Sequence, residues 1–97
     1  GRFVLDNGAR RAVELQGKSL LAAGIVRVEG SFEKGEVVSL VDQSGDEFAR
    51  GLTNYDATSA KDIVGKRTEE IAKSIGVLPY AEVIHRDNLV VRSLLKN

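Results

Sequence analysis

The sequence predicts a single small domain, mainly β with small helices, built as an antiparallel barrel or sandwich. The 97 residues suffice for one hydrophobic core and leave no room for a second. Short runs with the composition of strands follow one another, with turn residues about every eight to twelve positions. These runs do not alternate regularly with helices, as the strands of a βαβ fold would.

The first expected elements are a strand at residues 3–5 and a helix at residues 9–15. Asp6 stands between them and is a suitable N-cap, because its carboxylate can accept hydrogen bonds from the free N–H groups of the first helical turn. Gly17 is expected to end the helix, since glycine adopts the left-handed cap conformation without steric cost.

Three strands are expected in the middle of the chain, at residues 25–29, 37–41 and 47–53. Residues 25–29 alternate in polarity as a half-buried strand does, and residues 37–41 are the most strand-like run in the sequence. Residues 42–45 form the turn that joins the second and third of these strands. Gly51 marks an expected β-bulge in the third strand.

Two short helices are expected next. Ser59 and Asp62 have the spacing of a capping box, which predicts a helix that ends at Gly65. Thr68, followed by two glutamates, opens a second helix that ends at Gly76.

After the only proline, Pro79, the chain returns to strands at residues 82–85 and 88–91, with a bend at residues 86–87. The predicted total is about six short strands, one early helix and two short late helices. Neither an internal repeat nor a linker divides the sequence, so residues 1–97 are expected to form one domain.

The charge is balanced overall but unevenly distributed. The chain has 14 basic and 14 acidic residues, which argues against tight nucleic-acid binding as its main task. Residues 1–28 nevertheless hold five cations against two acids, whereas residues 29–47 hold one cation against six acids. Both stretches are equally well explained as solvated surface.

Composition also limits the kinds of site. The absence of cysteine and the single histidine exclude disulfides and argue against a metal site built from these residues. Cysteine usage is compatible with a cytoplasmic protein. No apolar run is long enough to cross a bilayer, so we expect no membrane contact. The chain begins with Gly1 and contains no methionine, which indicates a segment of a longer protein.

Two strings that suggest catalysis lack the context they need. Residues 12–19 have the spacing of a phosphate-binding loop, but a helix runs into this loop and none follows it. Residues 85–88 are similar to the catalytic loop of protein kinases, yet Arg92 stands where that loop requires an asparagine for Mg²⁺. We therefore expect no catalytic, cofactor-binding or metal-binding residue in this chain.

One segment, residues 17–24, remains a candidate binding site. Lys18 offers a positive charge and Ser19 a hydroxyl donor, while Leu20 and Gly24 would shape a groove. The predicted RNA or phosphate contacts are Arg10, Arg11, Lys18, Ser19, Leu20 and Gly24. The alternative is that the leucines fill the core and the glycines turn the chain, and residue types alone leave both interpretations open.

The same segment carries a family resemblance. Residues 17–25, GKSLLAAGI, are similar to the hallmark of PUA domains, which joins the first helix to the second strand and often contacts RNA. Ala22 departs from the proline usual there, at some loss of rigidity. Three later segments resemble more specifically the PUA domains attached to bacterial glutamate 5-kinases: residues 49–55, 63–67 and 82–90.

This resemblance implies a PUA-like pseudo-barrel of mixed strands that follows an amino-acid-kinase domain absent from this chain. The parent enzyme would phosphorylate L-glutamate with ATP and Mg²⁺ in the first step of proline biosynthesis, in the cytoplasm. This chain would be its accessory or regulatory domain rather than an enzyme, and no catalytic residue can be carried onto it. The implied partners are the kinase domain, RNA and further copies of the parent. The alternative function is an RNA-binding module.

Overall fold

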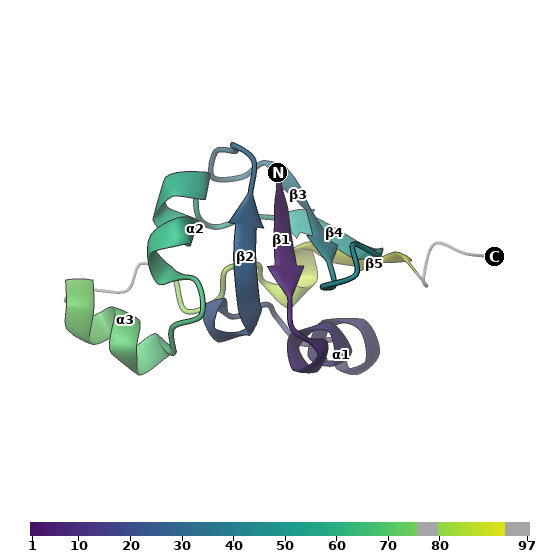
Figure 1. Ribbon diagram of the computed structural model, residues 1–97, viewed down its shortest axis with the longest axis horizontal. Coiled ribbons are helices and arrows are strands. Elements are labelled where there is room, and N and C mark those ends of the chain that lie inside the picture. The colour runs from purple at the N-terminus through teal and green to yellow at the C-terminus, as the bar shows by residue number, and fades with distance from the viewer. Residues whose placement is uncertain (76–79, 93–97) are drawn as a thin grey trace.

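A computed structural model describes residues 1–75 and 80–92. The helices are α1 (Asn7–Gln16), α2 (Ala57–Ile63) and α3 (Thr68–Ile75), with 3₁₀ turns at Ala22–Gly24 and Arg86–Asn88 (Figure 1). The strands are β1 (Arg2–Leu5), β2 (Ile25–Glu29), β3 (Val37–Val41), β4 (Glu47–Leu52) and β5 (Leu89–Val91).

The strands form one five-stranded sheet in the order β2-β1-β3-β4-β5. The β1–β3 pair is parallel, and the other three pairs are antiparallel. The expected mainly β fold with mixed strands and small helices is confirmed, whereas a purely antiparallel sheet is not. β2 runs antiparallel to β1, and the chain reverses again before β3, so β3 runs parallel to β1 on the side opposite β2.

The expected strand at residues 82–85 is wrong. In its place a single antiparallel bridge joins Leu20 to Ile84. The Val83 N–H donates to the Leu20 carbonyl at 2.8 Å, while the Val83 carbonyl accepts from the Asn54 N–H at 2.8 Å. The segment therefore bonds to two different loops instead of forming a ladder with one strand. Its valine and isoleucine are buried, which is why the sequence resembles a strand.

The first helix follows the prediction closely. Its N-cap is Asp6, whose carboxylate accepts a hydrogen bond from the Ala9 N–H at 2.7 Å. Its C-cap is Gly17 in the left-handed conformation at φ 63°. The helix begins at Asn7, two residues earlier than expected, because the cap residue itself fixes the start. Its buried residue, Val13, faces the core.

The predicted bulge at Gly51 is wrong, since this residue pairs regularly with Val38 and Leu89. Glycine is needed here for space: a Cβ atom would lie 2.8 Å from the Asn88 carbonyl oxygen. The register of β4 shifts elsewhere, between the partners of Leu40 and Val41.

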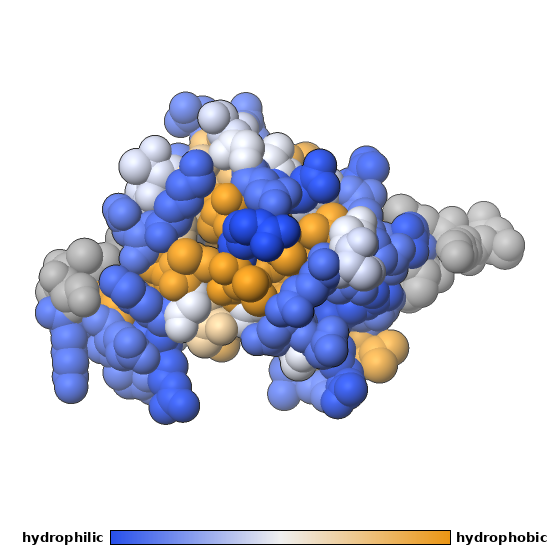
Figure 2. Space-filling model, in the orientation of Figure 1, coloured by the Kyte–Doolittle hydropathy of each residue, from blue (hydrophilic) through white to orange (hydrophobic). Residues whose placement is uncertain are grey.

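A second register shift occurs in β2, where Ile25 and Arg27 pair with adjacent residues of β1. Val26 is the extra residue, and its side chain is 47% exposed. Such bulges redirect a side chain out of the regular alternation. Figure 2 shows hydrophobic surface over β2, bordered by hydrophilic residues.

The late helices confirm the expected elements but correct one cap. The N-cap of α2 is Asp56, whose carboxylate accepts from the Ser59 N–H at 2.7 Å. Ser59 therefore lies inside the helix, and the predicted capping box is wrong. Gly65 follows the helix at φ 77°, and α3 begins at Thr68 as expected. Gly76 lies outside the described residues.

The hydrophobic core collects side chains from the strands, all three helices and the segment around Ile84. Phe3 and Phe32 pack edge to face, with their ring centroids 5.4 Å apart. The largest fully buried hydrophobic side chains are Phe3, Phe48, Leu5, Leu20, Ile25, Leu40 and Ile84. Within residues 1–75 and 80–92, no helix is long and apolar enough to cross a membrane.

Candidate functional site

A groove of about 330 Å³ lies between α1 and the segment of residues 18–24. Four of the six predicted contact residues line it, namely Lys18, Ser19, Leu20 and Gly24. The structure therefore brings these four together around one concave surface. Arg10 and Arg11 are not among the lining residues.

The backbone of this segment is fixed at both of its ends. The Lys18 N–H donates to the Ala12 carbonyl at 3.0 Å, which turns the chain sharply away from α1. At the other end, the Gly24 carbonyl accepts from the Asp6 N–H at 3.0 Å. Both walls of the groove therefore depend on the caps of α1.

Leu20 is principally a core residue. Its side chain is 1% exposed, and its N–H donates to the Ile84 carbonyl at 2.9 Å. It forms the closed floor of the groove and presents almost no surface to a ligand. Of the two leucines expected to fill the core, Leu20 does so, whereas Leu21 is 45% exposed. Lys18, Ser19 and Gly24 line a groove, and their contact with RNA or phosphate stays a prediction.

Ser19 connects the groove to the C-terminal part of the chain. Its hydroxyl oxygen accepts a hydrogen bond from the Arg86 N–H at 2.8 Å, which leaves the hydroxyl hydrogen free to donate. This contact brings the 3₁₀ turn at Arg86–Asn88 beside Lys18. Sequence reasoning missed Arg86, since 67 residues separate the two partners and no local pattern signals the contact.

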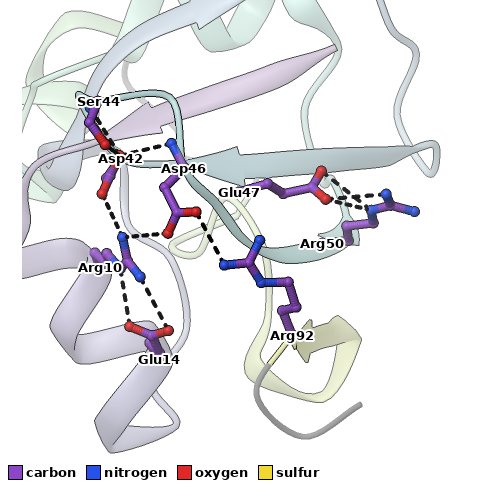
Figure 3. A network of polar contacts seen from close by, with 8 residues as sticks. All are labelled: Arg10, Glu14, Asp42, Ser44, Asp46, Glu47, Arg50 and Arg92. Carbon is purple, nitrogen blue, oxygen red and sulfur yellow. Dashed lines mark hydrogen bonds and ion pairs between the residues drawn. The ribbon is translucent and has the colours of Figure 1, made fainter. Parts of the chain in front are cut away.

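Arg10 points into a network of carboxylates (Figure 3) and does not line the groove. Its guanidinium lies 3.0 Å from Glu14, 2.5 Å from Asp42 and 3.1 Å from Asp46. It also lies 4.8 Å from the centre of the Phe48 ring. The three carboxylates, with Glu14 the largest contributor, raise the pKa of Arg10 above its ordinary value. The network ties α1 to the turn between β3 and β4.

Asp42 is the acceptor at the centre of this turn. Hydrogen bonds from the Ser44 hydroxyl, from the backbone of Asp46 and Ser44, and from Arg10 lower its pKa to about 2. Asp46 also pairs with Arg92 at 3.1 Å, so β5 is tied to the same turn. The charge of Arg10 is thereby matched within the protein.

Lys18 is the cation that lines the groove, and the backbone of Arg86 lies next to it through the hydrogen bond to Ser19. Arg11 lies on α1 outside the lining. All three side chains are exposed, and no ion pair joins any of them to a residue within the described ranges. The groove thus combines an apolar floor, a free hydroxyl donor and a cationic rim. This arrangement can bind a phosphate group together with a flat or apolar moiety. No cluster of three histidine or acidic residues suited to a metal ion occurs among the residues that the structure describes.

Comparison with known proteins identifies relatives along nearly the whole chain. A sequence model of the PUA domain matches residues 1–75. Glutamate 5-kinases from Dictyoglomus turgidum and Hahella chejuensis are each 52% identical to the chain over 91 residues, and that from Moorella thermoacetica is 46% identical over 91 residues. In each case the match covers 94% of this chain but only 24% of the relative.

Solved structures agree with this fold. A PUA domain from Aeropyrum pernix, crystallised as a tartrate complex, superposes with a TM-score of 0.61 at 30% identity, over 64% of this chain and 34% of that one. A conserved PUA domain protein from Thermoplasma acidophilum superposes with a TM-score of 0.57 at 25% identity, over 87% of this chain and 47% of that one.

Proposed function

The chain belongs to the PUA domain family, and we propose from this premise that it is the accessory domain of a glutamate 5-kinase. The observation that carries the proposal is the 46–52% identity to three glutamate 5-kinases over 94% of the chain. Because the match covers only 24% of each relative, the proposed parent is a much longer protein. In it, residues 1–97 form the PUA domain and the remainder contains the amino-acid-kinase domain.

In this proposal the parent transfers a phosphoryl group from ATP to L-glutamate, with Mg²⁺, at the first step of proline biosynthesis in the cytoplasm. We assign ATP, Mg²⁺ and the catalytic residues to the kinase domain. The phosphate-loop-like string in this chain supports that assignment, because it is followed by the bridge from Leu20 to Ile84 and then by a single 3₁₀ turn at Ala22–Gly24. Without an α-helix directly after it, the string lacks the N–H groups that would hold a nucleotide phosphate.

Removal of this domain from the parent tests the proposal. We expect the shortened enzyme still to phosphorylate glutamate, with a changed sensitivity to proline or a changed oligomeric state. Activity, a proline inhibition curve and light scattering measure these three properties. A parent without glutamate kinase activity would refute the assignment of the enzyme. A shortened enzyme identical to the parent in all three properties would refute the accessory role.

A second candidate function is RNA binding. The specific observation in its favour is the groove beside α1, which is lined by Lys18 and adjoined by the backbone of Arg86; both side chains are exposed and have no ion pair among the described residues. A ligand with several phosphates and unstacked bases would match the cationic rim and the apolar floor.

A further inference from the structure

Three large aliphatic side chains are exposed on one side of β3, β4 and β5. Val37 is 60% exposed, Leu52 41% and Val90 48%. Val37 and Leu52 face each other as a cross-strand pair, and Val90 is paired with Arg50. Their neighbours along the strands, Val38 and Val91 among them, are buried, so the exposed set faces away from the core. We call this surface the β3–β5 face.

The β3–β5 face is hollowed. A groove of about 430 Å³ is lined by Val37, Glu47, Ala49, Arg50, Val90 and Arg92. A second groove, of about 350 Å³, adjoins it and is lined by Val37, Arg50, Gly51, Leu52, Asp87, Asn88 and Val90. Because Val37, Arg50 and Val90 line both, the two form a continuous furrow across the three strands.

The charges beside this furrow are paired. Arg50 contacts Glu47 at 3.2 Å, and Arg92 contacts Asp46 at 3.1 Å. A surface whose cations are matched in this way has little attraction for a polyanion, in contrast to the groove beside α1. The β3–β5 face therefore suits a protein surface with apolar side chains and a few polar groups at its rim.

The two edge strands of the sheet, β2 and β5, differ in their contacts with helices. At the β2 end, α2 packs against the edge strand (Figure 1). At the other end β5 is the edge strand, and none of the described helices packs extensively against it. A sheet edge without an extensive helical cover, next to exposed aliphatic side chains, is a surface that proteins normally cover or occupy.

We propose that the β3–β5 face docks on the remainder of the parent chain, an inference that rests on the proposed function. The relatives are about four times as long as this chain, which accounts for 24% of each. A partner on the same polypeptide is present at a high effective concentration, so a small, partly polar surface is enough to hold it. Val37, Leu52 and Val90 supply the apolar contacts, and Arg50 lies between them.

Thiol labelling of the full-length parent tests this docking. Val90→Cys and Leu52→Cys place a thiol in the face, and Val26→Cys is the matched control because its 47% exposure equals that of Val90 within one per cent. Each alkylation rate is divided by the rate at the same site in urea, which removes intrinsic reactivity. We expect cysteines at positions 52 and 90 to react about tenfold more slowly than the control, as a docked population of about nine-tenths requires. Two independent sites guard against one variant that fails to fold.

Other outcomes overturn the inference. Equal rates at positions 26, 52 and 90 would show that the face is free in the parent, and protection at position 26 alone would place the contact over β2. Protection that disappears on roughly hundredfold dilution would identify a second copy as the occupant, because a tethered contact does not depend on concentration. A glutamate kinase assay on the same samples separates two kinds of failure. If the face is unprotected but the parent phosphorylates glutamate, only the docking is refuted. If the parent has no glutamate kinase activity, the proposed function is refuted.

Discussion

Ala9 and Gly24 lie in such close contact that a Cβ atom on Gly24 would be 2.4 Å from the Cβ of Ala9. Both partners belong to regular elements, α1 and the 3₁₀ turn before β2, so neither can move independently. We therefore expect Gly24→Ala to lower the free energy of unfolding by about 1–3 kcal/mol, the range for overpacking a fixed contact. Urea unfolding followed by circular dichroism measures this change.

Gly8→Ala is the matched control for that substitution. Gly8 also lies in this region, but a Cβ atom there would meet its nearest neighbour, Asp6 Oδ1, at an unstrained 3.4 Å. Alanine is the better helix former, so this variant should be as stable as the wild type or up to about 1 kcal/mol more stable. Equal losses in both variants would show that the close contact has no special role.

The network around Arg10 leads to a second prediction. Arg10→Gln leaves Glu14, Asp42 and Asp46 close together without their shared cation, and removes the contact with the Phe48 ring. Because Arg10 is only 25% exposed, we expect a loss of about 1–2 kcal/mol in the free energy of unfolding, above the range for surface pairs.

Arg11→Gln serves as the comparison in the same helix. Arg11 is exposed and has no ion pair to a residue in the described ranges, so its replacement should change the free energy of unfolding by less than about 0.5 kcal/mol. Thermal and urea unfolding of both variants at low salt measure the difference. A loss in Arg11→Gln as large as that in Arg10→Gln would contradict the role of the network.

Asp42 makes stability depend on pH at the acidic end. Its pKa falls from 3.8 to about 2 on folding, so the unfolded chain binds the proton more tightly. The contribution of Asp42 is therefore fully present above pH 3.8 and is lost as the pH falls toward 2. We expect Asp42→Asn to be less stable than the wild type at pH 6 and to lose less stability between pH 4 and pH 2. Parallel curves for the two proteins over that interval would refute the prediction.

Features set by neighbouring residues were predictable from the sequence, and features set by distant contacts were not. Asp6 and Gly17 cap α1 as expected, because a cap is decided within one helical turn. The cap of α2 was misassigned, since Asp56 and Ser59 both have suitable side chains and the position of the preceding turn decides between them. Serine and aspartate are both favourable N-cap residues, so residue type alone does not decide which of the two caps the helix.

The groove could be anticipated in the same limited way. Gly17 and Gly24 bound one short segment of the sequence, and the structure places Lys18, Ser19 and Gly24 on one groove, while their contact with a ligand stays a prediction. Arg86 was missed because the bridge between Leu20 and Ile84 brings it there, and the sequence pattern around Ile84 indicated a regular strand instead. Arg10 was assigned to a ligand because its partners Asp42 and Asp46 lie on a turn more than thirty residues away.

RNA binding, if it is a function of this domain, must use the cations that the protein leaves unmatched. Lys18 in the groove and Arg86 next to it meet this condition. Each of Lys18→Gln and Arg86→Gln should therefore weaken binding and lower the slope of log K against log salt by about 0.7–0.9, which corresponds to one phosphate contact. Arg10→Gln should act on stability and leave the slope unchanged, because that guanidinium already contacts three carboxylates.

Titrations with a structured RNA and a single-stranded RNA at several salt concentrations measure these slopes. Lys61→Gln is the control, since Lys61 is an exposed lysine on α2 that does not line the groove. If the Lys61 variant loses as much slope as the Lys18 variant, the binding is general attraction to positive charge and the groove has no part in it.

Binding no tighter than about millimolar at low salt would remove the RNA-binding function altogether, since non-specific protein–DNA binding already reaches dissociation constants of about 10⁻⁴ to 10⁻⁶ M. A selective loss in the Lys18 and Arg86 variants would instead make the contact between Ser19 and Arg86 part of the binding site, because it brings the backbone of Arg86 next to the groove that Lys18 lines.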